Sequence, residues 1–221
     1  MIEKIKYAIF DMDGTLIDSL GYWDYFWEKF GEKYFPGTNF KIDEDIDKSI
    51  RTITMQASSV LLRDRYLPEI DSNEILDLAN SMLEEHYGTR VNPKDGSVEF
   101  LKQLKSRGIK MCVASATEPK YVKYALERHG LYDLFEFSIS CNEVGAGKDK
   151  PDVFLEAMRR LGGKLSETCV FEDSFIALET AKNAGFMTVG IYDENNYCQD
   201  RLKAASDMYI ADGHTVLEVL G

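Results

Sequence analysis

The architecture of this chain can be worked out from residues 7–16, whose sequence is YAIFDMDGTL. The run Tyr7–Phe10 is continuously apolar, which is typical of a strand covered by helices on both faces. Asp11 and Asp13 follow at once, and Gly14 then permits a tight turn. Two carboxylates held close together repel each other unless a cation or a proton relieves the repulsion. The stretch therefore predicts a buried strand that ends in a ligand-binding acidic loop.

Four more short apolar runs recur along the chain, at Lys110–Ala114, Phe137–Cys141, Thr168–Phe171 and Met187–Tyr192. Helix-length segments lie between the runs, and each is followed by glycine, the usual residue after a helix end. These segments are Pro93–Arg107, Glu118–His129, Pro151–Leu161 and Ser174–Ala184. The alternation predicts an α/β fold, a doubly wound, Rossmann-like parallel sheet.

Residues 18–89 break this alternation, because they contain helical patterns and no convincing strand. Helices are expected over Asp47–Tyr66 and Ser72–Tyr87, and a 4-3-4 spacing predicts one more. That spacing puts four aromatic residues on one helical face: Trp23, Trp27, Phe30 and Tyr34. We therefore expect a core formed by residues 1–17 and 90–221, with residues 18–89 inserted as a helical domain.

Composition restricts the partners and the compartment. The net charge of −12 argues against nucleic acid or an anionic membrane as a partner, because both require a concentrated basic face. No apolar run approaches the ~20 residues of a membrane span, and the N-terminus is typical of a first strand. Cys112, Cys141 and Cys169 lie in apolar runs without a CxxC pair, which favours reduced core thiols. We expect a cytoplasmic protein, with monomer as the default.

Polar side chains follow several of the apolar runs, and in open parallel sheets ligands bind beyond the carboxyl ends of the strands. Ser115 comes at the end of the second run, and Glu172 and Asp173 follow the fourth. Lys148 and Lys150 precede the helix that starts at Pro151. Carboxylates for a hard metal, a hydroxyl donor and a lysine together indicate a phosphate site.

These segments, in this order, resemble the haloacid dehalogenase superfamily. The resemblance is to its phosphatase and phosphomutase branch with a helical cap, which includes phosphoglycolate phosphatase and β-phosphoglucomutase. It extends over residues 1–17 and about 90–221. The motifs that carry it are Asp11-Met12-Asp13-Gly14-Thr15, Ser115, Lys148 with Pro151-Asp152-Val153-Phe154, and Glu172-Asp173.

The resemblance implies a covalent mechanism. Asp11 would be the nucleophile that forms an aspartyl-phosphate, and Asp13 would be the general acid and then the general base. Mg²⁺ would be held by Asp11, Asp173, the backbone carbonyl of Asp13, and Glu172. Alternatively, Glu172 would not bind the ion itself but would orient a ligand or a metal-bound water.

The resemblance also implies how the phosphoryl group is held. The Ser115 hydroxyl and the backbone N–H of Ala116 would donate to phosphoryl oxygens, and Lys148 would balance their charge. Two alternatives stay open at this point. Ser115 could cap the following helix, and Lys150 could replace Lys148, although its place at a helix start favours the surface.

The helical insertion is expected to close over the site and to select a small phosphorylated metabolite, with hinges near Ile17–Ser19 and Thr89–Asn92. Trp23, close in sequence to the acidic loop, and Arg51, where related enzymes place a cation, are candidate substrate contacts. Packing within the helical domain and a surface position are the competing interpretations for these two residues.

Three alternative functions require residues or domains that differ from those of this chain. A nucleotide P-loop fails because Asn142 and Asp149 stand where glycine and a hydroxyl residue are needed. A β-phosphoglucomutase-type phosphomutase shares every core motif, but Trp23 replaces a histidine, Thr15 a non-hydroxyl residue, and Glu118-Pro119 polar residues. A receiver-like module would accept phosphate on Asp11 without turnover, yet it needs neither Asp13 nor a helical domain. We therefore expect a Mg²⁺-dependent phosphatase.

Overall fold

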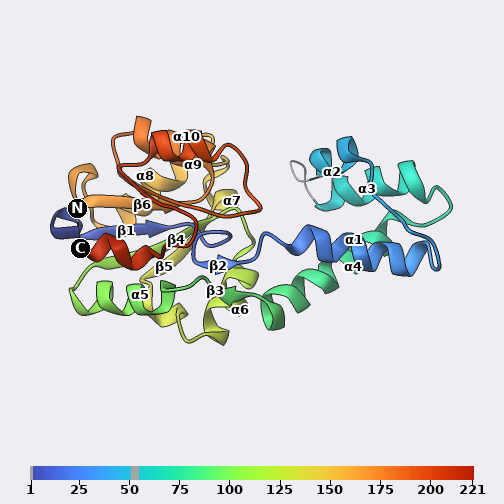
Figure 1. The fold of residues 1–221 in the computed structure, drawn as a ribbon, viewed down its shortest axis with the longest axis horizontal. Coiled ribbons are helices and arrows are strands. Elements are labelled where there is room, and N and C mark those ends of the chain that lie inside the picture. Colours follow the sequence, from blue (N-terminus) through green and yellow to red (C-terminus); the bar gives the residue numbers. More distant parts are fainter. Residues whose placement is uncertain (1, 51–54) are drawn as a thin grey trace. The chain divides into compact units, whose positions relative to one another are not determined.

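The computed structural model describes residues 2–50 and 55–221. Its contacts divide the chain into two compact units, shown in Figure 1. The core unit comprises Met1–Leu20 and Arg90–Gly221, and the helical unit comprises Gly21–Thr89. The first division falls three residues later than the sequence boundary at 17/18, and the second falls at the same position.

The core unit is built on a six-stranded sheet with the order β5-β4-β1-β6-β7-β8, in which every neighbouring pair is parallel. The strands are β1 Tyr7–Phe10, β4 Lys110–Ser115, β5 Phe137–Ser140, β6 Thr168–Glu172, β7 Met187–Ile191 and β8 Met208–Ile210. Strand β1 lies between β4 and β6, and Phe10 is in register with Val113 on one side and Phe171 on the other. The expected Rossmann-like parallel sheet is confirmed.

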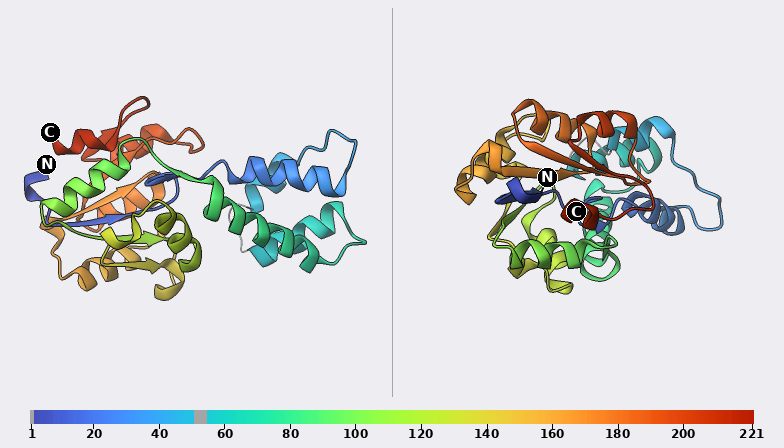
Figure 2. Two further views of the ribbon diagram at one scale, coloured as in Figure 1. Left: turned by 90° about the horizontal axis from the view of Figure 1, so that it is seen from below. Right: turned by 60° about the vertical axis from the view of Figure 1, so that its left-hand side comes forward.

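Helices cover both faces of this sheet, as Figures 1 and 2 show. One face carries α8, α9 and α10, and the opposite face carries α5 and α6. Their bounds are α5 Ser97–Ser106, α6 Pro119–Arg128, α8 Asp152–Leu161, α9 Phe175–Asn183 and α10 Gln199–Ala205. Because β1 is buried on both faces, its side chains alternate between two apolar layers: Ile9 packs in the cluster that contains Phe154 of α8, and Phe10 stacks on Phe171 at 4.4 Å between ring centroids.

Two details of the sheet differ from the sequence prediction. The edge strand β8 was not predicted, because its three residues are too few to show a periodicity. Cys141 does not end β5 but begins the short helix α7, Cys141–Val144. The cause is a capping box, in which Ser140 Oγ accepts from Asn142 N and the Glu143 carboxylate accepts from Ser140 N.

The helical unit contains α1 Tyr22–Tyr34, α2 Glu44–Ile50, α3 Met55–Tyr66 and α4 Ser72–Glu85. The predicted helix Asp47–Tyr66 falls on α2 and α3, and residues 51–54 between them lie outside the described residues. The buried face of α1 consists of Tyr22, Phe26 and Phe30. The buried face of the helix is therefore shifted relative to the predicted stripe. Of the four aromatic residues in that stripe, only Phe30 belongs to the buried face, and the other three are half-buried beside it.

A two-stranded ladder joins the chain segments that lead into and out of the helical unit. Strand β2, Ile17–Asp18, pairs antiparallel with β3, Asn92–Pro93. The N–H of Lys94 extends the ladder by donating to Leu16 O at 2.9 Å. Both ends of the insertion are thus fixed to the core unit within a few residues of the acidic loop.

The four cysteines are free thiols, and Cys112, Cys141 and Cys169 are buried, as the sequence predicts for core cysteines. Cys198 is exposed. Within the described part of the chain, no helix combines the length and the apolar character that crossing a bilayer requires.

Candidate active site

Three neighbouring strands deliver the candidate residues to one edge of the sheet. Asp11 directly follows β1, and its N–H donates to Phe171 O at 3.0 Å, which continues the pairing with β6. Ser115 is the last residue of β4, and Glu172 is the last residue of β6. Because parallel strands end at the same edge, residues more than 150 positions apart in the sequence converge here.

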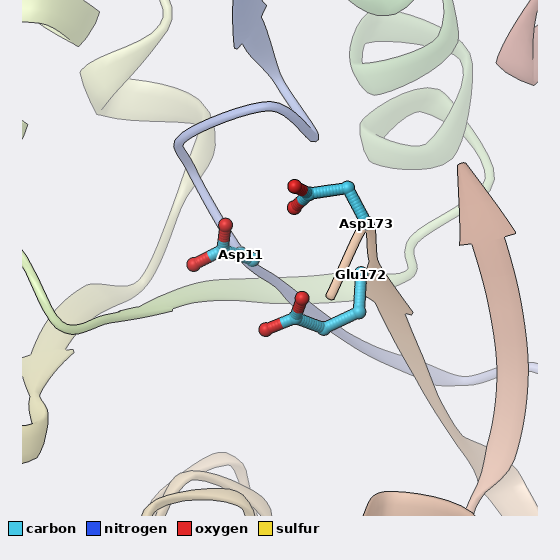
Figure 3. Close-up of side chains that lie close together, drawn as sticks. All are labelled: Asp11, Glu172 and Asp173. Atoms are coloured by element: carbon cyan, nitrogen blue, oxygen red, sulfur yellow. The ribbon is translucent and has the colours of Figure 1, made fainter. Parts of the chain in front are cut away.

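Asp11, Glu172 and Asp173 form a compact acidic cluster, shown in Figure 3. One carboxylate oxygen from each lies within 4.8 Å of the others, and the three residues are 7%, 1% and 4% exposed. Three buried carboxylates this close are costly without a cation. Oxygen ligands of this kind suit a hard divalent ion, so the donor set fits a group such as the Mg²⁺ that the resemblance implies.

A cation, Lys148, enters this cluster. Its Nζ donates to Asp11 Oδ1 and, at 2.6 Å, to Glu172 Oε1. The second oxygen of Glu172 accepts from Ser174 N at 2.9 Å. Lys150 is exposed. Of the two lysines that the sequence offered, it is therefore Lys148 that contacts Asp11.

The electrostatics of the cluster follow from burial and crowding. Burial raises the pKa of Asp11 to about 7, against the opposing effect of Lys148, and the negative charges of Glu172 and Asp13 raise it further. Burial also raises the pKa of Asp173 well above its ordinary value, with Glu172 and Asp11 adding to the effect. Burial alone lowers the pKa of Lys148, but its two carboxylate partners outweigh it and leave that pKa raised. In the absence of a bound cation, burial and the mutual repulsion of the carboxylates therefore favour the protonated forms of Asp11 and Asp173.

Asp13 is half-buried and is held by two hydroxyl groups. Ser19 Oγ donates to Asp13 Oδ1 at 2.6 Å, and Thr117 Oγ1 donates to Asp13 Oδ2 at 2.7 Å. Both donors belong to the core unit, and one directly follows β2 while the other lies in the turn after β4. These bonds fix the direction of the carboxylate at the mouth of the acidic loop.

The Ser115 side chain lies in a turn at the end of β4 and is 2% exposed. Its Oγ accepts from Thr117 N at 2.9 Å, so its own proton can be donated to a bound anion. Helix α6 has Glu118 as its N-cap residue, and Ser115 therefore does not cap it. Ala116, the neighbouring candidate, is exposed.

Asp173 is fixed from two sides. Thr15 Oγ1 donates to Asp173 Oδ1 at 2.8 Å, and Asn196 Nδ2 donates to Asp173 Oδ2 and, at 3.2 Å, to its backbone carbonyl. Gly14 packs against the same carboxylate with φ +74°, and a Cβ at this position would overlap Asp173 Oδ2. Gly14 is therefore required here both for its backbone conformation and for its lack of a side chain.

Sequence reasoning missed Thr117, Ser19 and Asn196. A signal was available for Asn196, because the polar stretch after the apolar run 187–192 belongs to the same edge of the sheet. Thr117 follows Ser115 in the turn already singled out. Trp23 lies in the helical unit, where its ring stacks on Trp27, and Arg51 lies outside the described residues.

Comparison with known proteins identifies the family. The model of the haloacid dehalogenase-like hydrolases matches residues 5–185. (DL)-Glycerol-3-phosphatase 1 of Arabidopsis thaliana is 27% identical over 206 residues, covering 88% of this chain and 67% of that protein. β-Phosphoglucomutase of Bacillus subtilis is 26% identical over 196 residues, covering 85% and 83%.

The fold has solved counterparts. The crystal structure of CbbY from Rhodobacter sphaeroides in complex with phosphate superposes with a TM-score of 0.72, at 20% identity and 93% coverage of each chain. At this identity the likeness concerns the fold. Together with the match over most of the chain, it confirms the resemblance drawn from the four motifs: the chain belongs to the haloacid dehalogenase-like hydrolases.

Proposed function

We infer that the protein is a Mg²⁺-dependent phosphatase that hydrolyses a small phosphorylated metabolite through an aspartyl-phosphate on Asp11. The observation that carries this proposal is the setting of Asp11. Its carboxylate stands at the end of the central strand, bound by Lys148 and packed beside two further buried carboxylates. A structural aspartate gains nothing from such crowding, whereas a nucleophile for phosphorus needs a cation and a metal beside it.

The chemistry is two displacements at phosphorus. In the first, an oxygen of Asp11 bonds to phosphorus while the ester oxygen departs and takes a proton from Asp13. In the second, Asp13 removes a proton from water, the water oxygen bonds to phosphorus, and the bond to Asp11 breaks. The hydroxyl groups of Ser19 and Thr117 support this role, because they aim the Asp13 carboxylate in both steps.

Mg²⁺ would be held by Asp11, Asp173, the backbone carbonyl of Asp13, and Glu172, either directly or by orienting a ligand. When bound, it would neutralise charge between an anionic nucleophile and an anionic substrate. The hydrogen bonds from Thr15 and Asn196 to Asp173 support this assignment, since metal-binding carboxylates are usually oriented by such partners. Glu172 also accepts from Lys148, which favours its orienting role.

The phosphoryl oxygens would be bound by three groups of the core unit. Ser115 has a hydroxyl proton to donate, the backbone N–H of Ala116 lies in the next position, and Lys148 supplies positive charge. Lys148 must then shift from Asp11 toward the incoming phosphoryl group. The raised pKa of Lys148 supports this role, because it keeps the ammonium charged throughout the physiological range.

The helical unit would act as a cap that excludes water and selects the leaving group, with Trp23 and Arg51 as candidate substrate contacts. Small-angle scattering with and without a phosphate mimic would test closure, and identical curves would count against it. An Arg51→Ala variant with an unchanged KM for every substrate would remove Arg51 from the site.

The buried free thiols favour a reducing compartment. We therefore propose a cytoplasmic protein, with monomer as the default state.

A phosphomutase is the second candidate, and the relative named β-phosphoglucomutase favours it. Thr15, Trp23 and Glu118-Pro119, at positions where such mutases carry other residues, favour hydrolysis. In this chain the Thr15 hydroxyl donates a hydrogen bond to the Asp173 carboxylate.

The deciding experiment is phosphate release from a panel of phosphorylated metabolites, with Mg²⁺ and with EDTA. Asp11→Asn is the blank, and Asp133→Asn, an exposed aspartate of the same unit, is the matched control. We expect metal-dependent release that only Asp11→Asn abolishes. Interconversion of hexose phosphates after priming with a bisphosphate would support the mutase instead. Stable labelling of Asp11 without turnover would indicate a phosphate-accepting module.

A further inference from the structure

The loop after β7 supplies a second layer of contacts to the acidic cluster, and it lies beyond residues 5–185, which the family model matches. Within it, Asn196 bonds to Asp173, and Asp193 is 3% exposed although it is not a member of the acidic cluster. A buried aspartate needs a partner, and here the partner comes from a distant part of the chain.

That partner is Lys94, directly after β3. Its Nζ donates to three oxygens: Asp193 Oδ2 at 2.6 Å, Gly14 O at 2.7 Å and Tyr192 O at 2.9 Å. An ammonium group has three protons, so all of them are used. The lysine side chain is only 20% exposed. Lys94 thus ties the acidic loop to the end of β7.

The bond to Gly14 O controls two neighbouring groups. The N–H of Gly14 donates to Ile17 O at 2.9 Å, so Gly14 is held through both its N–H and its carbonyl. The Gly14 N–H belongs to the peptide that carries the Asp13 carbonyl, and the Gly14 carbonyl belongs to the next peptide, which leads to Thr15. Lys94 therefore holds Thr15, whose hydroxyl bonds to Asp173 Oδ1, and acts on the Asp13 carbonyl through Gly14.

The bond to Asp193 controls the opposite side of Asp173. Asp193 organises its turn by accepting from Asn195 N through Oδ1 at 2.9 Å and from Asn196 N through its carbonyl at 3.1 Å. The turn presents the Asn196 amide to Asp173. Lys94 and Asp193 therefore link Thr15 and Asn196, the two residues whose side chains donate to the two carboxylate oxygens of Asp173.

We propose that Lys94 and Asp193 form a clamp that positions Asp173 and the Asp13 carbonyl for Mg²⁺. Both are positioning residues, because they act through Gly14, Thr15 and Asn196 and touch no reacting atom. The inference rests on the metal site of the proposed function, but it concerns affinity for Mg²⁺ alone.

The test measures Mg²⁺ binding by calorimetry, without substrate, for the wild type, Lys94→Met, Asp193→Asn and the double variant. Lys182→Met is the matched control, since it removes a lysine–aspartate pair of the core unit, Lys182 with Asp207, away from the acidic cluster. Loss of groups that orient metal ligands weakens affinity by about 10–100-fold, and we expect this range for Lys94→Met and Asp193→Asn. The double variant should lose no more than the weaker-binding single variant, because the two residues act as one unit.

Wild-type affinity in Asp193→Asn would overturn the proposal. This variant decides even if Lys94→Met does not fold, because asparagine keeps the size of aspartate and the Oδ1 acceptor of the turn. An equal loss in Lys182→Met would also overturn it, since the effect would then be general destabilisation. A wild type without Mg²⁺ affinity would contradict the clamp as well. A wild type that binds Mg²⁺ but releases no phosphate would instead contradict the proposed function. The clamp would then still be decided by the Mg²⁺ affinities of the variants relative to that of the wild type.

Discussion

The acidic edge of the core unit and helix α1 of the helical unit are held by different kinds of contact. In the core unit, buried polar groups converge on one edge of the sheet, and hydrogen bonds from several loops fix them. In the helical unit, α1 packs through aromatic rings, for example Phe30 against Phe40 at 5.5 Å between centroids. Aromatic packing tolerates small displacements, whereas directed bonds to carboxylates do not. Substitutions should therefore affect chemistry in the core unit and stability in the helical unit.

The largest effect should come from Asp11→Asn. An amide is a very poor nucleophile, so we expect turnover to fall by roughly 10⁴-fold or more while the fold is retained. Single-turnover kinetics with the best substrate of the panel would measure this, and circular dichroism would check the fold. Substantial residual activity would show that Asp11 is not the nucleophile.

The opposite result is expected for Phe30→Ala in the helical unit. Phe30 is 0% exposed, and removing a buried phenyl ring costs about 3–5 kcal/mol of unfolding free energy. Because Phe30 belongs to the aromatic cluster and not to the acidic one, Mg²⁺ affinity of the folded protein should stay unchanged. Denaturant unfolding and calorimetry would measure the two effects. A parallel loss of Mg²⁺ affinity would show that the units are coupled.

Two glycines offer a more closely matched comparison. Gly14 and Gly37 have nearly the same φ, +74° and +76°, but only Gly14 has neighbours that an added Cβ would meet. Alanine at either position should cost about 1–3 kcal/mol of backbone strain. Gly14→Ala should in addition weaken Mg²⁺ binding, because its Cβ displaces Asp173. Equal Mg²⁺ affinities in the two variants would contradict the tight packing of the acidic loop.

The smallest effect concerns pH in the absence of metal. The pKa of Asp11 is raised from 3.8 to about 7, so the folded state binds its proton more tightly than the unfolded chain does. Stability in EDTA should therefore fall as the pH rises from about 4 to about 7, and the pKa of Asp173 shifts in the same direction. Asp11→Asn should reduce this slope and raise Tm at pH 7.5 by about 2–4 °C. Saturating Mg²⁺ should reduce the slope in the wild type, and an identical slope in both proteins would contradict the raised pKa.

Most of the fold was readable from the sequence because strands buried on both faces produce uninterrupted apolar runs. The convergence of Asp11, Ser115 and Glu172 followed from the rule that parallel strands end at one edge. What the sequence could not show were bonds between loops, such as those of Lys94, since nothing in their spacing encodes the contact. The difference on α1 has a similar cause: because aromatic residues occupy adjacent faces of this helix, including Tyr22 and Phe26 beside the predicted stripe, spacing alone does not identify the buried face.

The β2–β3 ladder has a consequence for how this chain can vary. Ile17 pairs with Pro93, so the core unit brings the two ends of the insertion together by its own hydrogen bonds. The entropy of closing a loop grows only slowly with its length, roughly as its logarithm. The core unit would therefore tolerate insertions of very different lengths between these strands with a similar loss of loop-closure entropy. The helical unit can be regarded as an exchangeable module, and grafting a different one onto the same two strands should leave the acidic cluster of Asp11, Glu172 and Asp173 assembled.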